Sequence, residues 1–175
     1  MLIYSCKKLG TDFVGAKSFG DIIEYPETRQ IHRTTKWKKG TIILGELTTG
    51  RKGLVTYEFN ISEDLLAEAK YAEIHVDKLF FNGRREKAIG KVRIGNSELF
   101  FIQDLSTGKP YQHLLGGFWA KRTWQKPDQP KMIFHPEKSC IQIPFELLSK
   151  EIRCAIEVSE IQQIIIRSIE LKIFS

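Results

Sequence analysis

The sequence TIILGELTTGRKGLVTYEF, residues 41–59, decides the fold class of this chain. Two runs rich in Ile, Leu, Val, Thr, Tyr and Phe flank the residues Thr-Gly-Arg-Lys-Gly at positions 49–53. β-Branched and aromatic side chains suit a pleated surface that is half buried, and glycine adopts positive φ angles at little cost. The stretch therefore predicts a β-hairpin or another tight connection between two strands.

Alternation in the second run supports this prediction and gives the strand one buried and one solvated face. The apolar members are Val55, Tyr57, Phe59 and Ile61, and the polar members between them are Thr56, Glu58 and Asn60. The next segment, Ser62–Lys70, is the best helical candidate, because Ser62 can cap the first free amides and acidic residues follow it. Leu65, Leu66 and Ala69 would lie on one side of that helix.

The other periodic segments also have the pattern of strands. Residues 1–40 form a looser opening, with strands expected near Asp21–Tyr25 and Arg29–Trp37. A turn is expected at Asn82-Gly83 and another at Gly95-Asn96. The later strands are predicted at Tyr71–Phe81, Lys91–Ile94, Leu99–Leu105, Lys131–His135, Ser139–Ile143, Ile152–Val158, Ile161–Arg167 and Ser168–Phe174, with one long kinked strand as the alternative for the last two. Many short strands and one helix indicate an all-β protein, an antiparallel β-sandwich or barrel.

Length and composition are those of an ordinary globular domain. The chain has 175 residues, 42% hydrophobic and 27% charged, with a net charge of +6 that permits an anionic partner without requiring one. Three cysteines, Cys6, Cys140 and Cys154, are too few for a disulfide scaffold, and buried free thiols are expected at 140 and 154, although these two could pair if their strands are neighbours.

The sequence shows no signal peptide and no apolar run long enough to span a bilayer. The protein is therefore expected to be intracellular, or to lack its leader in this chain, and no membrane partner is expected. No particular cellular compartment is predicted.

Several stretches together resemble galactose-binding-like jelly-roll domains, a group that includes many carbohydrate-binding modules. They are LTTGRKGLVTYEFNI, a short helix with YAEIHVD, KVRIGNSELF, and the C-terminal CIQIPFELLSKEIRCAIEVSEIQQIIIRSIELKIF. The resemblance covers residues 41–175 and implies a jelly-roll β-sandwich with paired first and last strands, loops gathered at one end and often a structural calcium ion. No calcium-ligand motif of the family matches here, so no cofactor is predicted. Residues 1–40 are predicted to be an N-terminal extension whose edge strands pack on the sandwich.

The long irregular segment predicted at Ser106–Pro130 holds the main candidate site. Sugar rings pack their C–H faces on Trp and Tyr, while their hydroxyls need planar donors and acceptors. A long loop on a rigid β scaffold often carries function. The alternative is that the tryptophans only cap the end of the sandwich. The aromatic and basic residues concerned are Tyr111, His113, Trp119, Lys121, Arg122, Trp124 and Lys126.

A second cluster of the same chemistry precedes the opening hairpin. Beside the first cluster it would form a basic aromatic groove suited to an acidic polysaccharide or to single-stranded nucleic acid. Alone, it would be a charged strand edge that resists edge pairing. Its members are His32, Arg33, Lys36, Trp37, Lys38 and Lys39, of which Arg33 and Trp37 are the predicted ligand contacts.

Glu73, His75 and Asp77 share one face of a predicted strand. Side chains two residues apart on a strand are about 7 Å apart, so two of the three could contact one metal ion but all three would not converge. The favoured interpretation is an exposed sheet face, which becomes a second candidate sugar cleft if the sheet is concave there. No metal ligands are therefore predicted.

No motif in the sequence specifies an enzyme. Gln30-Ile31-His32 matches a tripeptide of jelly-roll alginate lyases, but the tyrosine-rich companion motif is missing. Phosphate-binding loops, G-x-S-x-G and H-E-x-x-H are also missing. No catalytic residues are predicted, although a lyase or hydrolase stays an alternative.

The predicted function is thus a non-catalytic binding module with a carbohydrate ligand, for which the basic charge balance favours an acidic polysaccharide. Tyr111, Trp119 and Trp124 would stack on sugars, and His113 and Arg122 would supply polar contacts. The alternatives are a structural or assembly protein, whose aromatic loop contacts a protein partner or a second copy, and a single-stranded nucleic-acid binder.

Overall fold

The regular structure of the described residues is almost entirely β. In the computed structural model these residues are 1–17, 23–24, 30–31, 35–36, 40, 42–44, 53–77, 80–83, 88–102, 112–114, 122–138, 140–158 and 162–175. They contain one α-helix, α1 (Glu63–Glu68), and two 3₁₀ turns, η1 (Pro136–Lys138) and η2 (Phe145–Leu147). None of the helices in this described part has the length and apolar character needed to cross a membrane.

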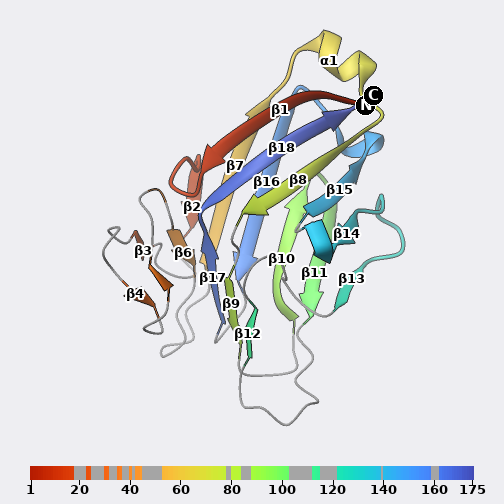
Figure 1. Ribbon diagram of the computed structural model, residues 1–175. Helices are drawn as coiled ribbons and strands as arrows, with labels where there is room; N and C mark the ends of the chain where they lie inside the picture. Colours follow the sequence, from red (N-terminus) through yellow and green to blue (C-terminus); the bar gives the residue numbers. More distant parts are fainter. Residues whose placement is uncertain are drawn as a thin grey trace.

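One layer of the fold is a five-stranded antiparallel sheet, here called sheet I (Figure 1). Its order is β1-β18-β8-β15-β14. The strands are β1 (Leu2–Leu9), β18 (Ser168–Phe174), β8 (Tyr71–Asp77), β15 (Cys140–Pro144) and β14 (Ile133–His135). The first and last strands of the chain are therefore partners, and the Met1 amino group donates to the Ser175 carbonyl oxygen at 2.9 Å.

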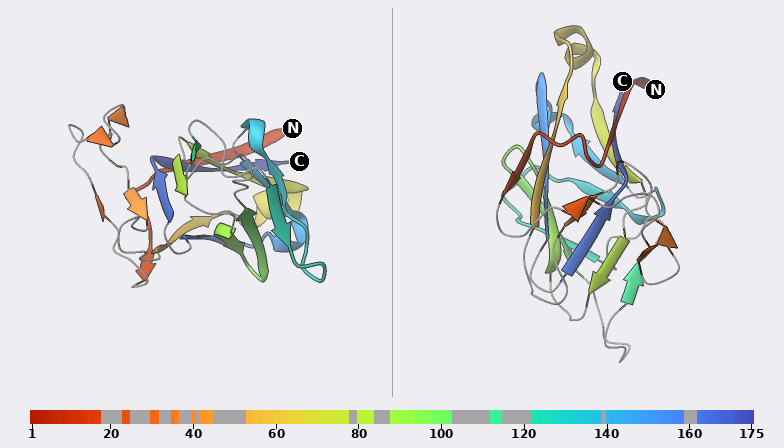
Figure 2. Two further views of the ribbon diagram at one scale, coloured as in Figure 1. Left: turned by 90° about the horizontal axis from the view of Figure 1, so that it is seen from below. Right: turned by 90° about the vertical axis from the view of Figure 1, so that its left-hand side faces the viewer.

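The facing layer is a six-stranded sheet, sheet II, with the order β13-β11-β10-β16-β7-β2 (Figure 2). Its strands are β13 (Arg122–Gln125), β11 (Ser97–Ile102), β10 (Ala88–Ile94), β16 (Glu151–Val158), β7 (Gly53–Asn60) and β2 (Gly15–Lys17). Apolar residues of both sheets form one core cluster, as expected when alternating side chains of two sheets interdigitate. Val55, Tyr57 and Phe59 of β7 are at most 1% exposed in that core.

A third sheet, sheet III, is connected to sheet I by the chain, because its strands β9 and β17 are sequence neighbours of β8 and β18. Sheet III has the order β12-β9-β17-β6-β3, and a separate pair joins β4 to β5. Arg167 alone separates β17 from β18, so one run of chain serves two sheets through a bend. The strands are β12 (Gln112–Leu114), β9 (Phe80–Gly83), β17 (Gln162–Ile166), β6 (Ile42–Leu44), β3 (Ile23–Glu24), β4 (Gln30–Ile31) and β5 (Thr35–Lys36).

A close backbone contact lies at this bend. The Gly10 amide donates to the Arg167 carbonyl oxygen at 2.8 Å, and the Tyr57 hydroxyl donates to the Gly10 carbonyl oxygen at 2.7 Å. A Cβ on Gly10 would lie 2.2 Å from the carbonyl oxygen of Ile166, so only glycine fits here. Tyr57 thereby ties sheet II to the end of β1, and burial raises the pKa of its phenol.

The structure confirms the all-β sandwich and most local predictions. The burial of β7 alternates as expected, and β10 and β11 form the hairpin around Gly95, which has φ 57°. Ala72, Ile74 and Val76 of β8 are buried as predicted, but Glu73 between them is buried as well. Ser62 caps α1 by accepting a hydrogen bond from the Leu65 amide at 3.2 Å. The jelly-roll resemblance implied paired first and last strands within residues 41–175, but β6, the first described strand of that range, pairs with β17 and β3. The last strand, β18, pairs instead with β1, which lies in residues 1–40.

Three local predictions were wrong. The two runs within residues 41–59 do not form a hairpin, because β6 pairs with β3 and β17 in sheet III, whereas β7 pairs with β2 and β16 in sheet II. Asn82-Gly83 is not a turn but part of β9. Part of the segment expected to be irregular, Ser106–Pro130, forms β12 and β13.

Candidate functional site

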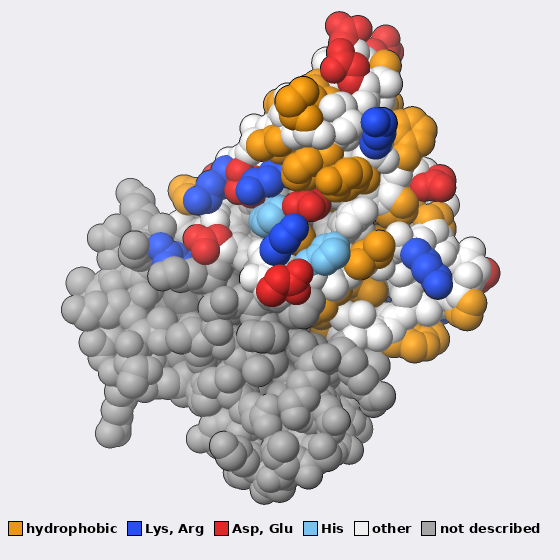
Figure 3. Space-filling view, turned by 45° about the vertical axis from the view of Figure 1, so that its right-hand side comes forward, with side chains coloured by type: hydrophobic (Ala, Val, Ile, Leu, Met, Phe, Trp, Pro, Cys, Tyr) orange, Lys and Arg blue, Asp and Glu red, His pale blue; other side chains and the backbone are white. Residues whose placement is uncertain are grey.

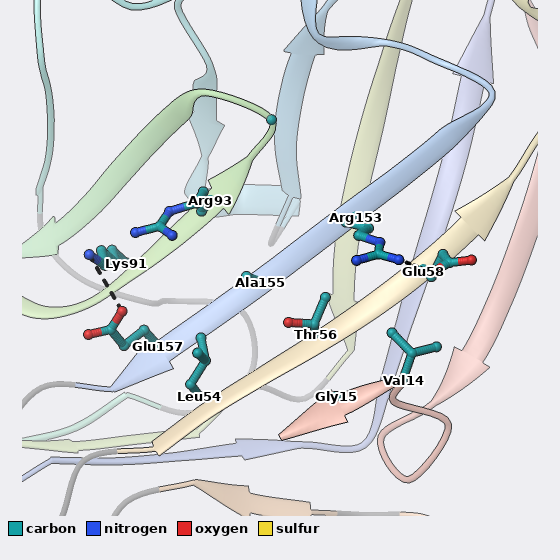
Figure 4. Close-up of a pocket in the computed structure, with 11 residues that line it drawn as sticks. Val14, Gly15, Leu54, Thr56, Glu58, Lys91, Arg93, Arg153, Ala155 and Glu157 are labelled. Atoms are coloured by element: carbon teal, nitrogen blue, oxygen red, sulfur yellow. Dashed lines mark ion pairs between the residues drawn. The ribbon is translucent and has the colours of Figure 1, made fainter. Parts of the chain in front are cut away.

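A pocket of about 550 Å³ lies on the outer face of sheet II, the face turned away from the core (Figure 4). Strands β2, β7, β10 and β16 supply most of its wall and floor. We call it the sheet II pocket. Its lining residues are Val14, Gly15, Leu54, Thr56, Glu58, Lys91, Arg93, Gly95, Arg153, Ala155 and Glu157.

Strand register explains why the pocket is hollow. Arg93 pairs with Ala155, Ala155 with Thr56, and Thr56 with Gly15, so these four residues form one row across four strands. Residues directly opposite each other project from the same face of a sheet. The row thus carries small side chains at its centre and a long guanidinium at one end, which leaves room above the floor.

The pocket wall is charged, and the charges are paired. The Arg153 guanidinium lies 3.2 Å from a carboxylate oxygen of Glu58. The Lys91 ammonium lies 3.5 Å from carboxylate oxygens of both Glu157 and Glu98. The Arg153 side chain is 62% exposed, and exposed ion pairs contribute little to stability, so Arg153 can exchange Glu58 for a ligand at low cost.

Among these anions, Glu98 contacts two cations, Arg93 and Lys91. Both Nε and a terminal nitrogen of Arg93 donate to its Oε1, the first at 2.9 Å. Partial burial raises the pKa of the Glu98 carboxyl, but hydrogen bonding from Arg93 and the charge of Lys91 outweigh this effect, so the net pKa is lowered. Glu98 therefore stays ionised and holds both cations over the sheet.

Aromatic side chains extend the pocket face towards the sheet edge. Trp124 on β13 pairs with Phe100 on β11, and Phe100 pairs with Lys91 on β10. The two rings have centroids 5.3 Å apart at an angle of 51°, and the Lys91 ammonium lies 5.7 Å from the Phe100 centroid. Trp124 is 49% exposed and lies two strand spacings, roughly 10 Å, from the Lys91 position.

A partly buried polar cluster holds the Trp124 strand in place. The side-chain amide of Gln125 donates to the hydroxyl oxygen of Ser97 and to the carbonyl oxygen of Pro130, the second at 2.8 Å. The side-chain oxygen of Gln125 accepts a hydrogen bond from the Met132 backbone amide at 3.0 Å. Ser97 in turn donates to Pro130 at 2.6 Å. These bonds fix β13 and the segment after it against β11.

The sequence-predicted binding residues are brought together only in part. Trp124 is exposed, as the binding hypothesis requires, but it lies on an edge strand rather than on a loop. The backbone of Arg122 lies on the same strand, and that of His113 lies on β12 in sheet III. Tyr111, Trp119, Arg33 and Trp37 lie outside the described residues, as do Lys121, His32, Lys38 and Lys39.

The prediction that Glu73, His75 and Asp77 form an exposed sheet face is wrong for Glu73, which is only 8% exposed. His75 Nε2 lies 2.6 Å from Glu73 Oε2, and Cys140 on β15, rather than Asp77, is the third residue near them. All three cysteines are free, and Cys140 and Cys154 are buried in different sheets. Burial raises the pKa of Cys140 to about 11 and that of Cys154 to about 12.

Sequence reasoning missed most residues of the sheet II pocket. Each of its strands shows an ordinary polar face, and nothing within one strand marks Arg93, Arg153 or Glu58 as special. The alternation in β7 and β16 could have shown which side chains share a face. Their convergence depends on the pairing of β7, β16 and β10, which are far apart in the sequence.

The fold and the pocket define the protein as an all-β sandwich with a charged, aromatic-edged depression on one sheet. The chain matches no family model, and no curated protein matches it in sequence. Among solved structures, it is similar to the mosquito-larvicidal Cry4Aa toxin from Bacillus thuringiensis, with a TM-score of 0.40 and 11% identity over 98% of this chain. The chain spans 24% of the length of that toxin chain.

It is also similar to the winged bean acidic lectin complexed with methyl-α-D-galactose. The TM-score is again 0.40, with 10% identity over 97% of this chain and 98% of the lectin chain. A TM-score of this size is too low for either structure to bear on the function of the present chain.

Proposed function

We propose that this protein is a non-catalytic carbohydrate-binding module that holds its ligand along the outer face of sheet II. The observation that carries the proposal is a half-exposed Trp124 on the same sheet face as the sheet II pocket. An indole face is a stacking surface for the C–H face of a sugar ring. The pocket volume of about 550 Å³ lies within the range of small-molecule sites.

The polar groups of the pocket suit sugar hydroxyls. The side chains of Arg93 and Arg153 are 51% and 62% exposed, so their planar N–H groups can reach a ligand. Glu58 and Glu157 add acceptors beside them. The small floor residues, Ala155 and Gly15, allow a flat ring to approach the sheet.

The charge of the lining favours a neutral or weakly charged glycan. Three cations, Lys91, Arg93 and Arg153, face two lining carboxylates and the adjacent Glu98, so the local charges nearly cancel. Recognition of a strongly acidic polysaccharide would depend on the basic cluster around Arg33 and Trp37. Membership of the galactose-binding-like group stays part of this proposal, supported by the antiparallel β-sandwich.

The test is a binding screen with matched variants. Wild-type protein is run in affinity electrophoresis against neutral and uronate-containing polysaccharides, and hits are measured by calorimetry. Trp124→Ala should weaken binding about tenfold or more, because a stacking aromatic contributes more than 1 kcal/mol at a binding hot spot. Phe145→Ala is the matched control, since Phe145 is 50% exposed but does not line the pocket.

A second variant tests the pocket itself. Ala155→Phe fills the floor of the sheet II pocket while leaving Trp124 in place, and it should abolish binding. Binding that survives both Trp124→Ala and Ala155→Phe would place the ligand elsewhere. A protein that binds no glycan but forms a discrete oligomer, or binds single-stranded DNA with steep salt dependence, would replace the proposal by one of its alternatives.

A further inference from the structure

The outer face of sheet I carries a compact polar cluster that the proposed function does not use. One row of paired residues crosses all five strands: Lys7, Glu170, His75, Cys140 and His135. Glu73 stands two residues before His75 on the same face of β8. In the space-filling view, histidine, acidic and basic side chains gather together on this side of the molecule (Figure 3).

Three of these residues bring different metal-ligating atoms together. A carboxylate oxygen of Glu73, a ring nitrogen of His75 and the sulfur of Cys140 all lie within 4.8 Å of one another. Strand pairing creates this set, because Cys140 on β15 is the direct partner of His75 on β8. Directly paired residues have Cβ atoms about 5 Å apart, which is close enough for both side chains to reach a shared point.

Two of the three side chains in this cluster are shielded from solvent, unlike those of an ordinary outer sheet face. Glu73 is 8% exposed and Cys140 is 0% exposed, while the His75 side chain is 20% exposed. Ionised groups shielded from water are paired or coordinate metal ions, because an isolated buried charge costs much free energy. A hydrogen bond from His75 satisfies only part of the acceptor capacity of a carboxylate.

We propose that Glu73, His75 and Cys140 form a site for one zinc ion, with water as the fourth ligand. A tetrahedral zinc ion with one S, one N and one O ligand sets those ligand atoms about 3.3–3.6 Å apart. The present separations, from 2.6 Å between His75 and Glu73 up to the 4.8 Å limit, bracket that range. Small side-chain rotations therefore suffice to admit the ion.

The donor set selects the class of metal. Thiolate and imidazole ligands favour zinc and similar borderline ions, whereas calcium and magnesium prefer sets made of oxygen alone. This site therefore differs from the structural calcium implied by the jelly-roll resemblance. The partial exposure of His75 leaves the fourth position open to water, as in zinc sites with three protein ligands.

The remaining histidine of the row supplies a matched control. His135 pairs with Cys140, but its Nε2 lies 3.1 Å from Gln142 Oε1 and its Nδ1 lies 3.6 Å from Glu137. Its ring is therefore engaged with other partners. Cys6 on β1 is a partly exposed thiol and serves as the control for nonspecific thiol binding.

The experiment is a calorimetric zinc titration of the 175-residue chain, free of any affinity tag, reduced and stripped of metal with a chelator. A single ion should bind per chain, and Glu73→Gln, His75→Gln and Cys140→Ala should each weaken binding by about tenfold or more. His135→Gln and Cys6→Ser should leave the affinity unchanged within about threefold, because removal of a non-ligand leaves coordination intact. Circular dichroism confirms that each variant is folded.

Cobalt provides a readout that does not depend on variants. Co²⁺ bound to the wild-type protein should show the near-ultraviolet charge-transfer band of a cobalt–thiolate bond, and zinc should remove it. Absence of that band, absence of stoichiometric zinc binding, or unchanged zinc affinity in Cys140→Ala would each overturn the proposal. An equal loss in His135→Gln and His75→Gln would overturn the assigned ligand set.

Discussion

Replacing Gly10 by alanine should destabilise the fold strongly, although it adds a single methyl group. A Cβ at this position would lie 2.2 Å from the carbonyl oxygen of Ile166 and 2.8 Å from that of Gly40. Both contacts are backbone atoms, so no side-chain rotation can relieve them. The chain must move by about 1 Å to restore an ordinary contact distance.

That movement breaks the hydrogen bonds that Gly10 makes. These are its amide bond to Arg167 and the bond that its carbonyl accepts from Tyr57, at 2.8 and 2.7 Å. Each bond contributes about 1 kcal/mol net, and a buried group left unpaired costs about 1–3 kcal/mol. Alanine recovers only about 0.4–1 kcal/mol by restricting the unfolded chain. The expected net loss in the free energy of unfolding is roughly 2–4 kcal/mol.

Guanidinium unfolding followed by tryptophan fluorescence and circular dichroism measures this loss. A thermal scan should show a melting temperature lower by about 5–15 °C, given about 2–4 °C per kcal/mol for a chain of this size. Gly15→Ala is the control, because a Cβ on Gly15 meets no atom within 4 Å. That variant should match the wild type or exceed it slightly.

Two results would refute the reasoning. A Gly10→Ala protein within about 0.5 kcal/mol of the wild type would show that the bend at Arg167 is not tightly packed. An equal loss in Gly15→Ala would show that the effect comes from glycine replacement in general rather than from the contact with Ile166.

Three further predictions concern other parts of the fold. Ser62→Ala removes the cap that Leu65 uses and should cost about 1 kcal/mol in denaturant unfolding, whereas Ser62→Asp should not. Gln125→Ala deletes hydrogen bonds to Ser97, Pro130 and Met132 and should lower the free energy of unfolding by about 2 kcal/mol, whereas an alanine substitution at an exposed position should leave it nearly unchanged. Burial raises the pKa of Cys154 from 9.0 to about 12, so its stabilising contribution is complete below pH 9 and is lost as the pH rises towards 12. The free energy of unfolding should therefore fall more steeply over that interval in the wild type than in Cys154→Ala, by roughly 4 kcal/mol at most, and equal slopes would contradict this.

Features set by neighbouring residues were predictable from the sequence. The two faces of β7 follow from strict alternation around Tyr57, and α1 follows from Ser62 and the acidic residues after it. Both depend on interactions within a few residues. The all-β class follows from the same local patterns repeated along the chain.

Features set by strand partners were not predictable in the same way. The runs around Ile43 and Val55 look like two arms of a hairpin, yet they pair with β17 and β16, respectively, strands that lie about 90 to 120 residues further along the sequence. Residue preferences describe how well a strand fits a pleated surface, not which strand lies beside it. For the same reason, the sequence did not predict that Cys140 lies beside His75, because this depends on the register of β15 against β8.

The pairing of β1 with β18 also has a consequence for engineering. Because Met1 and Ser175 lie side by side in the structure, a short glycine linker could join them without stretching either strand. New ends could then be opened at the Gly95-Asn96 turn between β10 and β11. Such a circular permutant would keep every sheet while moving the chain ends to that turn, and it would make a compact scaffold for inserting the module into another protein.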